Sequence, residues 1–296
     1  MRTICSAVNI EFLEEVNVSD NAIGFKGIDS IRHLLSGKRI QRLFMCNNGM
    51  SAEAVESVAQ LLLTGDCPPL KLFHFYNNMS GNGGAKAIAT IIRACSELVD
   101  LRFSATRSSA EGCIAIAEAI GTLTGLTRLD LSDNAFTAKG GVALAKALKG
   151  HTQLRHLNLR DAGVEEDGVT RLCDSLSSTT FPLTFLDLSG NDVTSDLMEE
   201  ALIPALAHLK ELEELYLDDN EIVSRVSAYA GRSYLFVGFR WSKVVSQSNR
   251  ERSLAISYEA FVVHLRTYCR WCLRDCSRCS KTQEISKYPV GWKRDL

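Results

Sequence analysis

The sequence has no run of about 18 apolar residues, so no helix long enough to span a bilayer is expected. The first residues, MRTICSAVNIEFLEEVNV, also lack the long apolar core of a secretory signal peptide. Because disulfides are rare in proteins that are not exported, the 10 cysteines are interpreted as reduced thiols. These absences predict a cytoplasmic protein that does not insert into a membrane.

The segment from Cys269 to Cys279 lacks the spacing of a zinc site, although it holds two CxxC pairs. Only three residues separate the pairs, whereas paired zinc knuckles need a dozen or more to bring both pairs round one ion. We therefore predict no metal site and no cofactor. Arg270, Arg274 and Arg278 would share one face of a helix, but this pattern is unspecific, so nucleic acid is not the expected partner.

Charge is divided unevenly along the chain. Residues 1–223 hold 19 basic and 30 acidic residues, a formal charge of −11, while residues 224–296 hold 14 basic and 5 acidic residues, a charge of +9. Segments of such different charge rarely share one surface role. We predict a folded domain over residues 1–223, which favours a basic partner, and an irregular or partly helical basic tail over residues 224–296.

Eight leucine-rich units fill the acidic part of the chain, at intervals of 27 to 30 residues. Each unit begins with LxxLxLxxN, as in LTRLDLSDN, and continues into a stretch with helical periodicity. Self-similarity at this period predicts a solenoid, which presents a long surface to a partner. The leading residues are Leu13, Ile40, Leu70, Leu98, Leu126, Leu154, Leu183 and Leu212.

Each unit is expected to contain one strand, one turn and one helix. Leu129 and Leu131 alternate with polar residues, which predicts a short strand with one buried face. An asparagine follows where the chain must turn, and its amide can bond to backbone groups there. This turn position holds Asn21, Asn48, Asn78, Asn134, Asn191 and Asn220.

The stretch after each turn has an apolar stripe at helical spacing, such as Val142, Leu144, Ala145 and Leu148. Small residues beside the stripe would let neighbouring helices approach closely. Units of this length have room for a full outer helix, which is typical of the ribonuclease-inhibitor type. The predicted fold is an α/β leucine-rich repeat solenoid, a horseshoe of about eight units.

Several segments resemble the Ran GTPase-activating proteins, in particular the plant type, over about residues 10–222. They are VSDNAIGFKGIDS, RLFMCNNGMSAEAVESVAQLL, LKLFHFYNNMSGNGGAKAIATII, LRFSATRSSAEGCIAIAEAI and LTRLDLSDNAFTAKGGVALAKAL. Three features depart from the family. Its further upstream units and its plant targeting domain are missing here, and this chain ends basic where the family ends acidic. The sequence therefore looks like an internal piece of the family fold joined to an unrelated tail.

The resemblance implies a protein that is not itself an enzyme. It would stimulate GTP hydrolysis in trans on the small GTPase Ran in its GTP-bound form, in nucleocytoplasmic transport. The place of action would be the cytoplasm, with the cytosolic face of the nuclear envelope as a candidate site. The alternative is a non-catalytic leucine-rich repeat scaffold that binds a protein.

The family is understood to act without an arginine finger, through an asparagine that holds Ran's own glutamine against the attacking water. That asparagine precedes the turn asparagine of an early unit, so the resemblance assigns the catalytic role to Asn47 in CNNGM. Asn77 has the same position in the next unit and is the main rival. A solvated turn amide is the simpler alternative for both.

Further partner-binding residues are expected on the strands and on their rim. Arg42, Arg102, Arg128 and Arg160 keep an arginine-finger variant open, but ion pairs with Asp100, Asp130 and Asp161 are the simpler interpretation. Asp20, Asp133, Asp161, Asp218 and Asp219 follow strands and would form a continuous negative band. The predicted partner-binding set is Asp20, Arg42, Tyr76, Asn77, Arg102, Asp133 and Asp161, with His74 and Tyr216 as added aromatic contacts.

Overall fold

The computed structural model describes residues 2–222 and 240–242. All of them belong to one compact unit, Met1–Arg252. The strands are β1 (Glu15–Asn17), β2 (Arg42–Phe44), β3 (Leu72–Tyr76), β4 (Asp100–Ser104), β5 (Arg128–Asp130), β6 (His156–Asn158), β7 (Phe185–Asp187), β8 (Glu214–Tyr216) and β9 (Arg240–Ser242). The helical elements are α1 (Arg2–Ser6), η1 (Ile10–Phe12), α2 (Gly24–Leu35), α3 (Ala52–Leu63), α4 (Gly81–Ala94), α5 (Ala110–Ile120), α6 (Thr137–Leu148), α7 (Glu165–Ser178), α8 (Ser195–Leu197), η2 (Met198–Leu202) and α9 (Ile203–Leu206).

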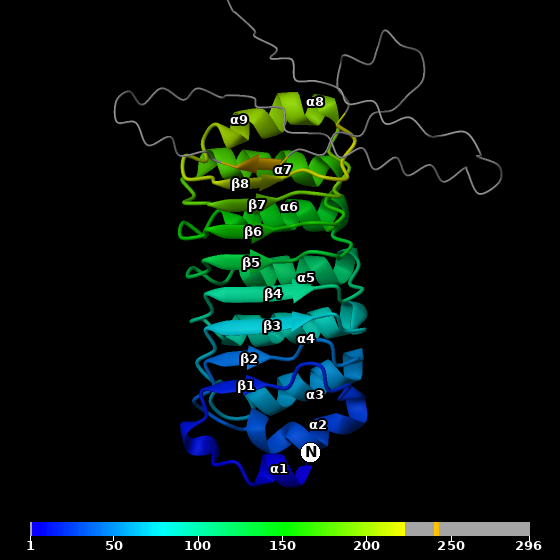
Figure 1. Cartoon of the computed structure of the whole chain (residues 1–296), viewed down its shortest axis with the longest axis vertical. Coiled ribbons are helices and arrows are strands. Elements are labelled where there is room, and N and C mark those ends of the chain that lie inside the picture. The colour runs from blue at the N-terminus through cyan, green and yellow to red at the C-terminus, as the bar shows by residue number, and fades with distance from the viewer. Residues whose placement is uncertain (1, 223–239, 243–296) are drawn as a thin grey trace, which may run out of the picture. The chain divides into compact units, whose positions relative to one another are not determined.

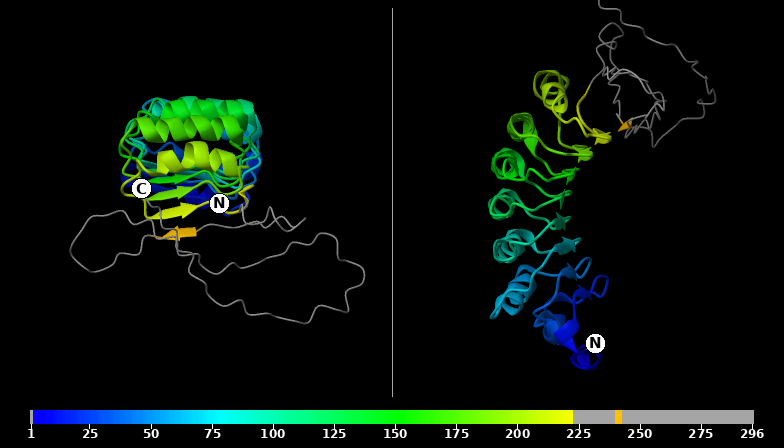
Figure 2. Two further views of the ribbon diagram at one scale, coloured as in Figure 1. Left: turned by 90° about the horizontal axis from the view of Figure 1, so that it is seen from above. Right: turned by 90° about the vertical axis from the view of Figure 1, so that its left-hand side faces the viewer.

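One sheet runs through the unit in sequence order, from β1 to β9 (Figure 1). The first eight strands are parallel, and Leu129 of β5 lies opposite Leu157 of β6 as the repeat predicts. Within residues 2–222 the strands line the inner side of an arc and the helices its outer side (Figure 2). The predicted α/β leucine-rich repeat solenoid is confirmed, and its sheet is not closed.

Among the described residues, the predicted tail contributes strand β9. Strand β9 pairs antiparallel with β8, Leu215 lying opposite Trp241. A short strand therefore forms in a segment that the sequence predicts as irregular or partly helical. The rest of that segment, including the candidate zinc cysteines from Cys269 to Cys279, lies outside the described residues. In the described parts of the chain, no helix combines the length and apolarity needed to cross a membrane.

The leucines of the repeat form one continuous core. Leu126, Leu129 and Leu131 are fully buried, and so are their counterparts in neighbouring units. The exception among the leading residues is Leu13, which is only partly buried because it belongs to the first unit of the stack. Burial of each leucine depends on the unit beside it, which is why such units are stable only as a stack.

Small residues bring the outer helices close together, as expected. A Cβ atom on Gly141 of α6 would lie 2.8 Å from the Gly168 Cα of α7, so a larger side chain does not fit. The predicted stripe on α6 is wrong at one residue, because Val142 is 41% exposed. Gly141, Leu144 and Leu148 are buried and follow the i, i+3, i+7 spacing of one helix face, and Val142 is turned away from that face.

The turn asparagines join successive units, which confirms their predicted role. Asn48 is buried, and its Nδ2 donates hydrogen bonds to the carbonyls of Val18, in the preceding unit, and Cys46, at 3.0 and 3.1 Å. Its Oδ1 accepts a hydrogen bond from the Asn21 backbone N–H of the preceding unit. Without Asn48 the Asn21 backbone N–H would lose this partner, so the turn asparagines, which we call the asparagine ladder, link the units along the inner rim.

His151 makes the stability of the stack depend on pH. The imidazole is fully buried, its Nε2 lies 3.1 Å from the Ile120 carbonyl oxygen, and its Nδ1 has no partner among the described residues. Burial lowers the pKa of His151 below its ordinary value of 6.5. As pH falls through 6.5, the imidazole of the unfolded chain binds a proton that the buried imidazole of the folded chain does not, so the free energy of unfolding falls with pH.

Between pH 7.5 and pH 5.5, the free energy of unfolding should decrease more for the wild-type protein than for the His151→Gln variant. The difference should be at most about 1.4 kcal/mol, the linkage energy of one group over one pH unit. Urea unfolding at both pH values measures it. The pKa of His156 is also lowered, by burial and by Arg128. Because His156 is present in both proteins, its contribution to the pH dependence cancels in the comparison. An equal loss in the two proteins would contradict the assignment.

Candidate functional site

One position in every unit has a left-handed backbone conformation, and we call this set the left-handed row. It immediately precedes the turn position, and its φ angles run from 50° to 66°. Asparagine, aspartate and glycine tolerate this conformation better than other residues. The backbone therefore favours these residue types here, whatever a partner requires. The row consists of Asp20, Asn47, Asn77, Ala105, Asp133, Asp161, Gly190 and Asp219.

The first three residues of the left-handed row form a hydrogen-bonded chain on the surface. Asn47 Nδ2 donates to Asp20 Oδ1 at 2.8 Å, and Asn77 Nδ2 donates to Asn47 Oδ1 at 2.9 Å. All three residues are exposed. These bonds use one of the two donors and one of the two acceptor lone pairs of the Asn47 amide. The remaining donor and acceptor can bind a second amide, such as a glutamine side chain.

Tyr76 and Arg102 lie together on the strands next to this chain. The Arg102 guanidinium carbon is 3.9 Å from the centroid of the Tyr76 ring, a cation–π contact. Arg102 Nε also lies 3.2 Å from a carboxylate oxygen of Asp130 and donates to Ser104 Oγ. Arg102 is thus bound to the sheet surface, and the ion-pair interpretation is confirmed for it.

Aromatic rings enlarge the surface around Tyr76. The Phe44 and His74 rings meet edge to face with centroids 5.2 Å apart, and His74 Nε2 lies 3.0 Å from a carboxylate oxygen of Asp100. The pKa of Tyr76 is raised by the neighbouring Cys46 and by burial. His74 and Tyr76 were expected on this surface from the sequence, whereas Phe44 was not. Its alternation with buried Leu43 on β2 was the signal that places it on this face.

Arg42 lies apart from the Asn47 chain. It begins β2, and its Nε pairs with a Glu15 carboxylate oxygen of β1 at 2.6 Å. Glu15 was not among the acidic partners expected from the sequence. Because Arg42 lies at the start of its strand and Asn47 follows the end of it, the structure does not bring these two candidates together.

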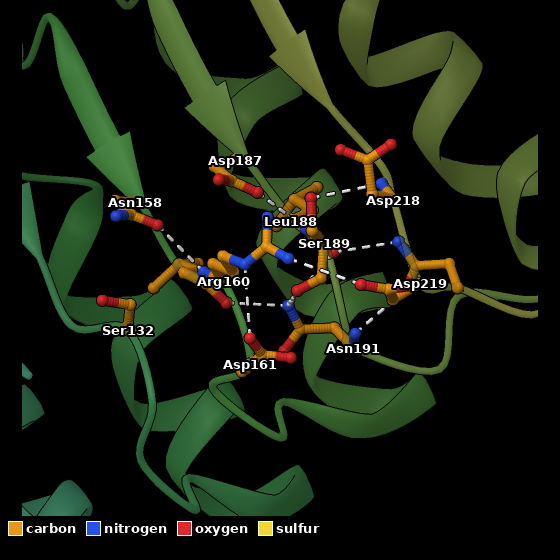
Figure 3. A network of polar contacts seen from close by, with 12 residues as sticks. Ser132, Asn158, Arg160, Asp161, Asp187, Leu188, Ser189, Asn191, Asp218 and Asp219 are labelled. Carbon is orange, nitrogen blue, oxygen red and sulfur yellow. Dashed lines mark hydrogen bonds and ion pairs between the residues drawn. The ribbon is translucent and has the colours of Figure 1, made fainter. Parts of the chain in front are cut away.

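Three aspartates, Asp133, Asp161 and Asp219, lie towards the other end of the left-handed row, and Figure 3 shows Asp161 and Asp219 beside Arg160. Arg160 lies between two of them, 3.3 Å from Asp161 and 3.4 Å from Asp219. Desolvation raises the pKa of Asp161, Arg160 opposes the rise, and the Asp219 and Asp133 carboxylates add to it. Gly190 leaves room for this arrangement, because a Cβ there would collide with the Asp161 carboxylate.

The predicted negative band is therefore not continuous. Asp20 is separated from the other acidic residues by the neutral residues Asn47, Asn77 and Ala105. Asp133, Asp161 and Asp219 form a separate group, which we call the acidic cluster, with Arg160 as an internal counter-ion. A basic partner can be attracted to the acidic cluster, but not along the whole rim.

A second aromatic group lies on β6, β7 and β8 and was mostly missed from the sequence. The rings of His156 and Phe185 stack with centroids 4.0 Å apart, and the Tyr216 ring lies 5.3 Å from Phe185. His156 and Phe185 begin neighbouring strands, and both are partly exposed. The inner face thus carries aromatic side chains near both ends, which is a feature of protein-binding surfaces.

Comparisons with known proteins identify the repeat. A family model described as "Leucine Rich repeat" matches residues 10–31, 123–145 and 181–196. No curated protein matches. Among solved structures the chain is similar to "Leiomodin-1 Actin-Binding Site 2 (ABS2)", with a TM-score of 0.40 and 21% identity over 51% of this chain and 90% of that chain. The three matched segments lie within the repeating units described above, so the family model agrees with the leucine-rich repeats of the structure.

Proposed function

We propose that this leucine-rich repeat protein stimulates GTP hydrolysis by the small GTPase Ran. The proposal rests on the resemblance of residues 10–222 to the Ran GTPase-activating proteins. The observation that carries it at the site is the Asn47 amide, exposed on the rim and oriented by Asp20 and Asn77. The protein would act in trans, in the cytoplasm, on Ran in its GTP-bound form.

The role proposed for Asn47 is to position the glutamine side chain of Ran. Hydrolysis of a bound nucleotide needs an attacking water held in line with the γ-phosphate, and Ran's own glutamine would hold it. An amide with one donor and one acceptor left over can bind that glutamine at both its oxygen and its nitrogen. Because Asp20 and Asn77 already fix the orientation of Asn47, little reorganisation is needed when Ran binds.

Aromatic and charged neighbours would supply the contact area. Phe44, His74 and Tyr76 present partly exposed rings on the strands beside Asn47. Arg102 is bound to Tyr76 and Asp130, so its role here is to shape the surface rather than to enter the nucleotide site. This arrangement agrees with activation that does not use an arginine finger.

Single-turnover hydrolysis tests the proposal directly. Ran loaded with GTP is mixed with an excess of the full chain, and phosphate release is followed against Ran alone. We expect a rate increase that saturates with chain concentration. If the chain binds GTP-loaded Ran but leaves the rate unchanged, the proposal of activation is wrong.

The second candidate function is a scaffold that binds a protein without a catalytic effect. The left-handed row favours it, because backbone conformation alone explains asparagine at positions 47 and 77 and aspartate at position 133. Binding of GTP-loaded Ran without stimulation, or binding of a different basic protein, would support the scaffold over the activator.

Whichever function holds, the acidic cluster should accelerate association with a basic partner. We expect the double variant Asp161→Asn, Asp219→Asn to lower the association rate severalfold at low salt and to have little effect at high salt. Screening shortens the reach of such charges to about 8 Å at physiological ionic strength. Stopped-flow measurements over a salt series test this. The matched control is the double variant Glu165→Gln, Glu166→Gln on the outer helix α7. If the association rates of the two double variants depend equally on salt concentration, a docking role for the acidic cluster is excluded.

A further inference from the structure

Two thiols from neighbouring units touch outside the candidate site. Cys67 Sγ lies 3.1 Å from Cys95 Sγ. Cys67 is in the loop between α3 and β3 and is partly exposed, whereas Cys95 follows α4 and is buried. Neither thiol belongs to the surface proposed to bind Ran.

The repeat itself brings these cysteines together. Each lies three residues before the leading residue of its unit, Leu70 or Leu98, and stacking therefore places one above the other. In the next two units the same position holds the buried residues Leu123 and His151. Two adjacent sulfur atoms thus occupy the position that holds buried side chains in the next two units.

We propose that Cys67 and Cys95 are a redox-sensitive pair that forms a disulfide between the third and fourth units. A disulfide needs a sulfur–sulfur distance of about 2.05 Å, so the two Sγ atoms must approach by roughly 1 Å. Neighbouring units already hold the two backbones in place, and small side-chain rotations supply this movement.

The oxidant is a low-molecular-weight disulfide such as oxidised glutathione. The Cys67 thiolate attacks one of its sulfur atoms, the glutathione disulfide breaks, and one glutathione thiolate leaves. The Cys95 thiolate then attacks Cys67 Sγ and releases the second glutathione thiolate. The two cysteines lose two electrons, the glutathione disulfide gains them, and the two cysteine protons pass to the two leaving thiolates through solvent.

The order of attack follows from exposure. Cys67 is the thiol that solvent and the oxidant can reach, so it reacts first. Burial raises the pKa of Cys95, and the neighbouring Cys67 raises it further. Because only the thiolate attacks, the second step should be the slow one and should accelerate as pH rises.

Mass spectrometry of the full chain tests the pair. Protein is incubated with oxidised glutathione, alkylated and digested with trypsin without reduction. We expect residues 43–71 to be linked to residues 94–102, the peptides that contain Cys67 and Cys95. Cys46 shares the first peptide, so Cys46→Ser is the matched control and should retain the link. Cys67→Ser should lose it.

Thermal unfolding provides an independent measurement. Oxidised wild type should melt about 5–10 °C above the reduced protein, because a cross-link over 28 residues restricts the unfolded chain, whereas Cys67→Ser should show no such difference. Cys95→Ala, which places no hydroxyl at this buried position, should also lose both the link and the difference in melting temperature. The proposal is wrong if folded wild type gives no linked peptide, if a glutathione adduct on Cys67 persists, or if Cys67→Ser still forms the link.

Discussion

Replacement of Asn47 by glycine should lower the stimulated rate of GTP hydrolysis on Ran on the order of a hundredfold, with little change in Ran binding. The amide contacts Ran's glutamine chiefly in the transition state, so its loss lowers the rate more than the affinity. Glycine is the appropriate replacement because Asn47 has a φ of 51°, a conformation that glycine adopts without strain. Asn47→Ala would add a backbone cost of about 1 kcal/mol.

Two matched variants separate the catalytic role from a structural one. Asn77→Gly removes the hydrogen bond that Asn77 donates to Asn47 and should have a milder effect, because Asp20 still orients the amide. Ala105→Gly changes the next position of the same row without removing a polar group, and it should leave the rate unchanged. If Asn47→Gly at saturating concentration matches wild type in single-turnover rate, Asn47 is not the positioning residue. If Asn77→Gly instead shows the large loss, the assignment is off by one unit.

Asn191→Ala should destabilise the solenoid by roughly 3 kcal/mol or more. The Asn191 side chain is fully buried, and its Nδ2 donates to the carbonyls of Leu159, Leu188 and Ser189. Its Oδ1 accepts from the Val164 backbone N–H. Alanine leaves the Val164 N–H without its partner, which costs about 1–3 kcal/mol for a buried group. It also removes one hydrogen bond from each of the three carbonyls, which keep a second donor, and each lost bond costs about 0.5–1.5 kcal/mol. Urea unfolding followed by circular dichroism measures the loss.

Asn158→Ala is the matched control for this prediction. Asn158 lies one unit earlier on the inner face, is partly exposed, and accepts a single backbone hydrogen bond from Arg160. Its replacement should cost no more than about 1 kcal/mol, since solvent can reach the group that loses its partner. Equal losses for the two variants would show that the asparagine ladder does not stabilise the inner rim beyond an ordinary surface hydrogen bond.

The architecture was predictable from the sequence because it depends on short-range regularity. Leu129 and Leu131 alternate, Asn134 ends the strand, and the pattern returns at 27 to 30 residues. In a stack, contacts are made between equivalent positions of adjacent units, so the period alone determines which strands pair. The prediction of which side chains are buried was less accurate. Val142 was included in the buried stripe because apolar character does not specify which face a helix buries.

The candidate site was predictable only as a set of positions. The sequence placed Asn47, Asn77 and the aspartates just past the strands, and this was correct. It did not show that all of them occupy one left-handed position, because a φ angle depends on how the turn is fixed by the next unit. It also did not show that the Asn47 amide is hydrogen-bonded to Asp20 and Asn77 rather than to an arginine.

The sequence by itself therefore determined the repeat, the order of strands β1 to β8 and the residue types on the rim. Only the tertiary structure decided how side chains from different units combine. It placed Arg102 on Tyr76, separated Asp20 from the acidic cluster, and brought the Cys67 and Cys95 sulfur atoms to 3.1 Å. The physical reason is that a period fixes which positions are neighbours, whereas the direction and distance of each side chain depend on the packing of the adjacent unit.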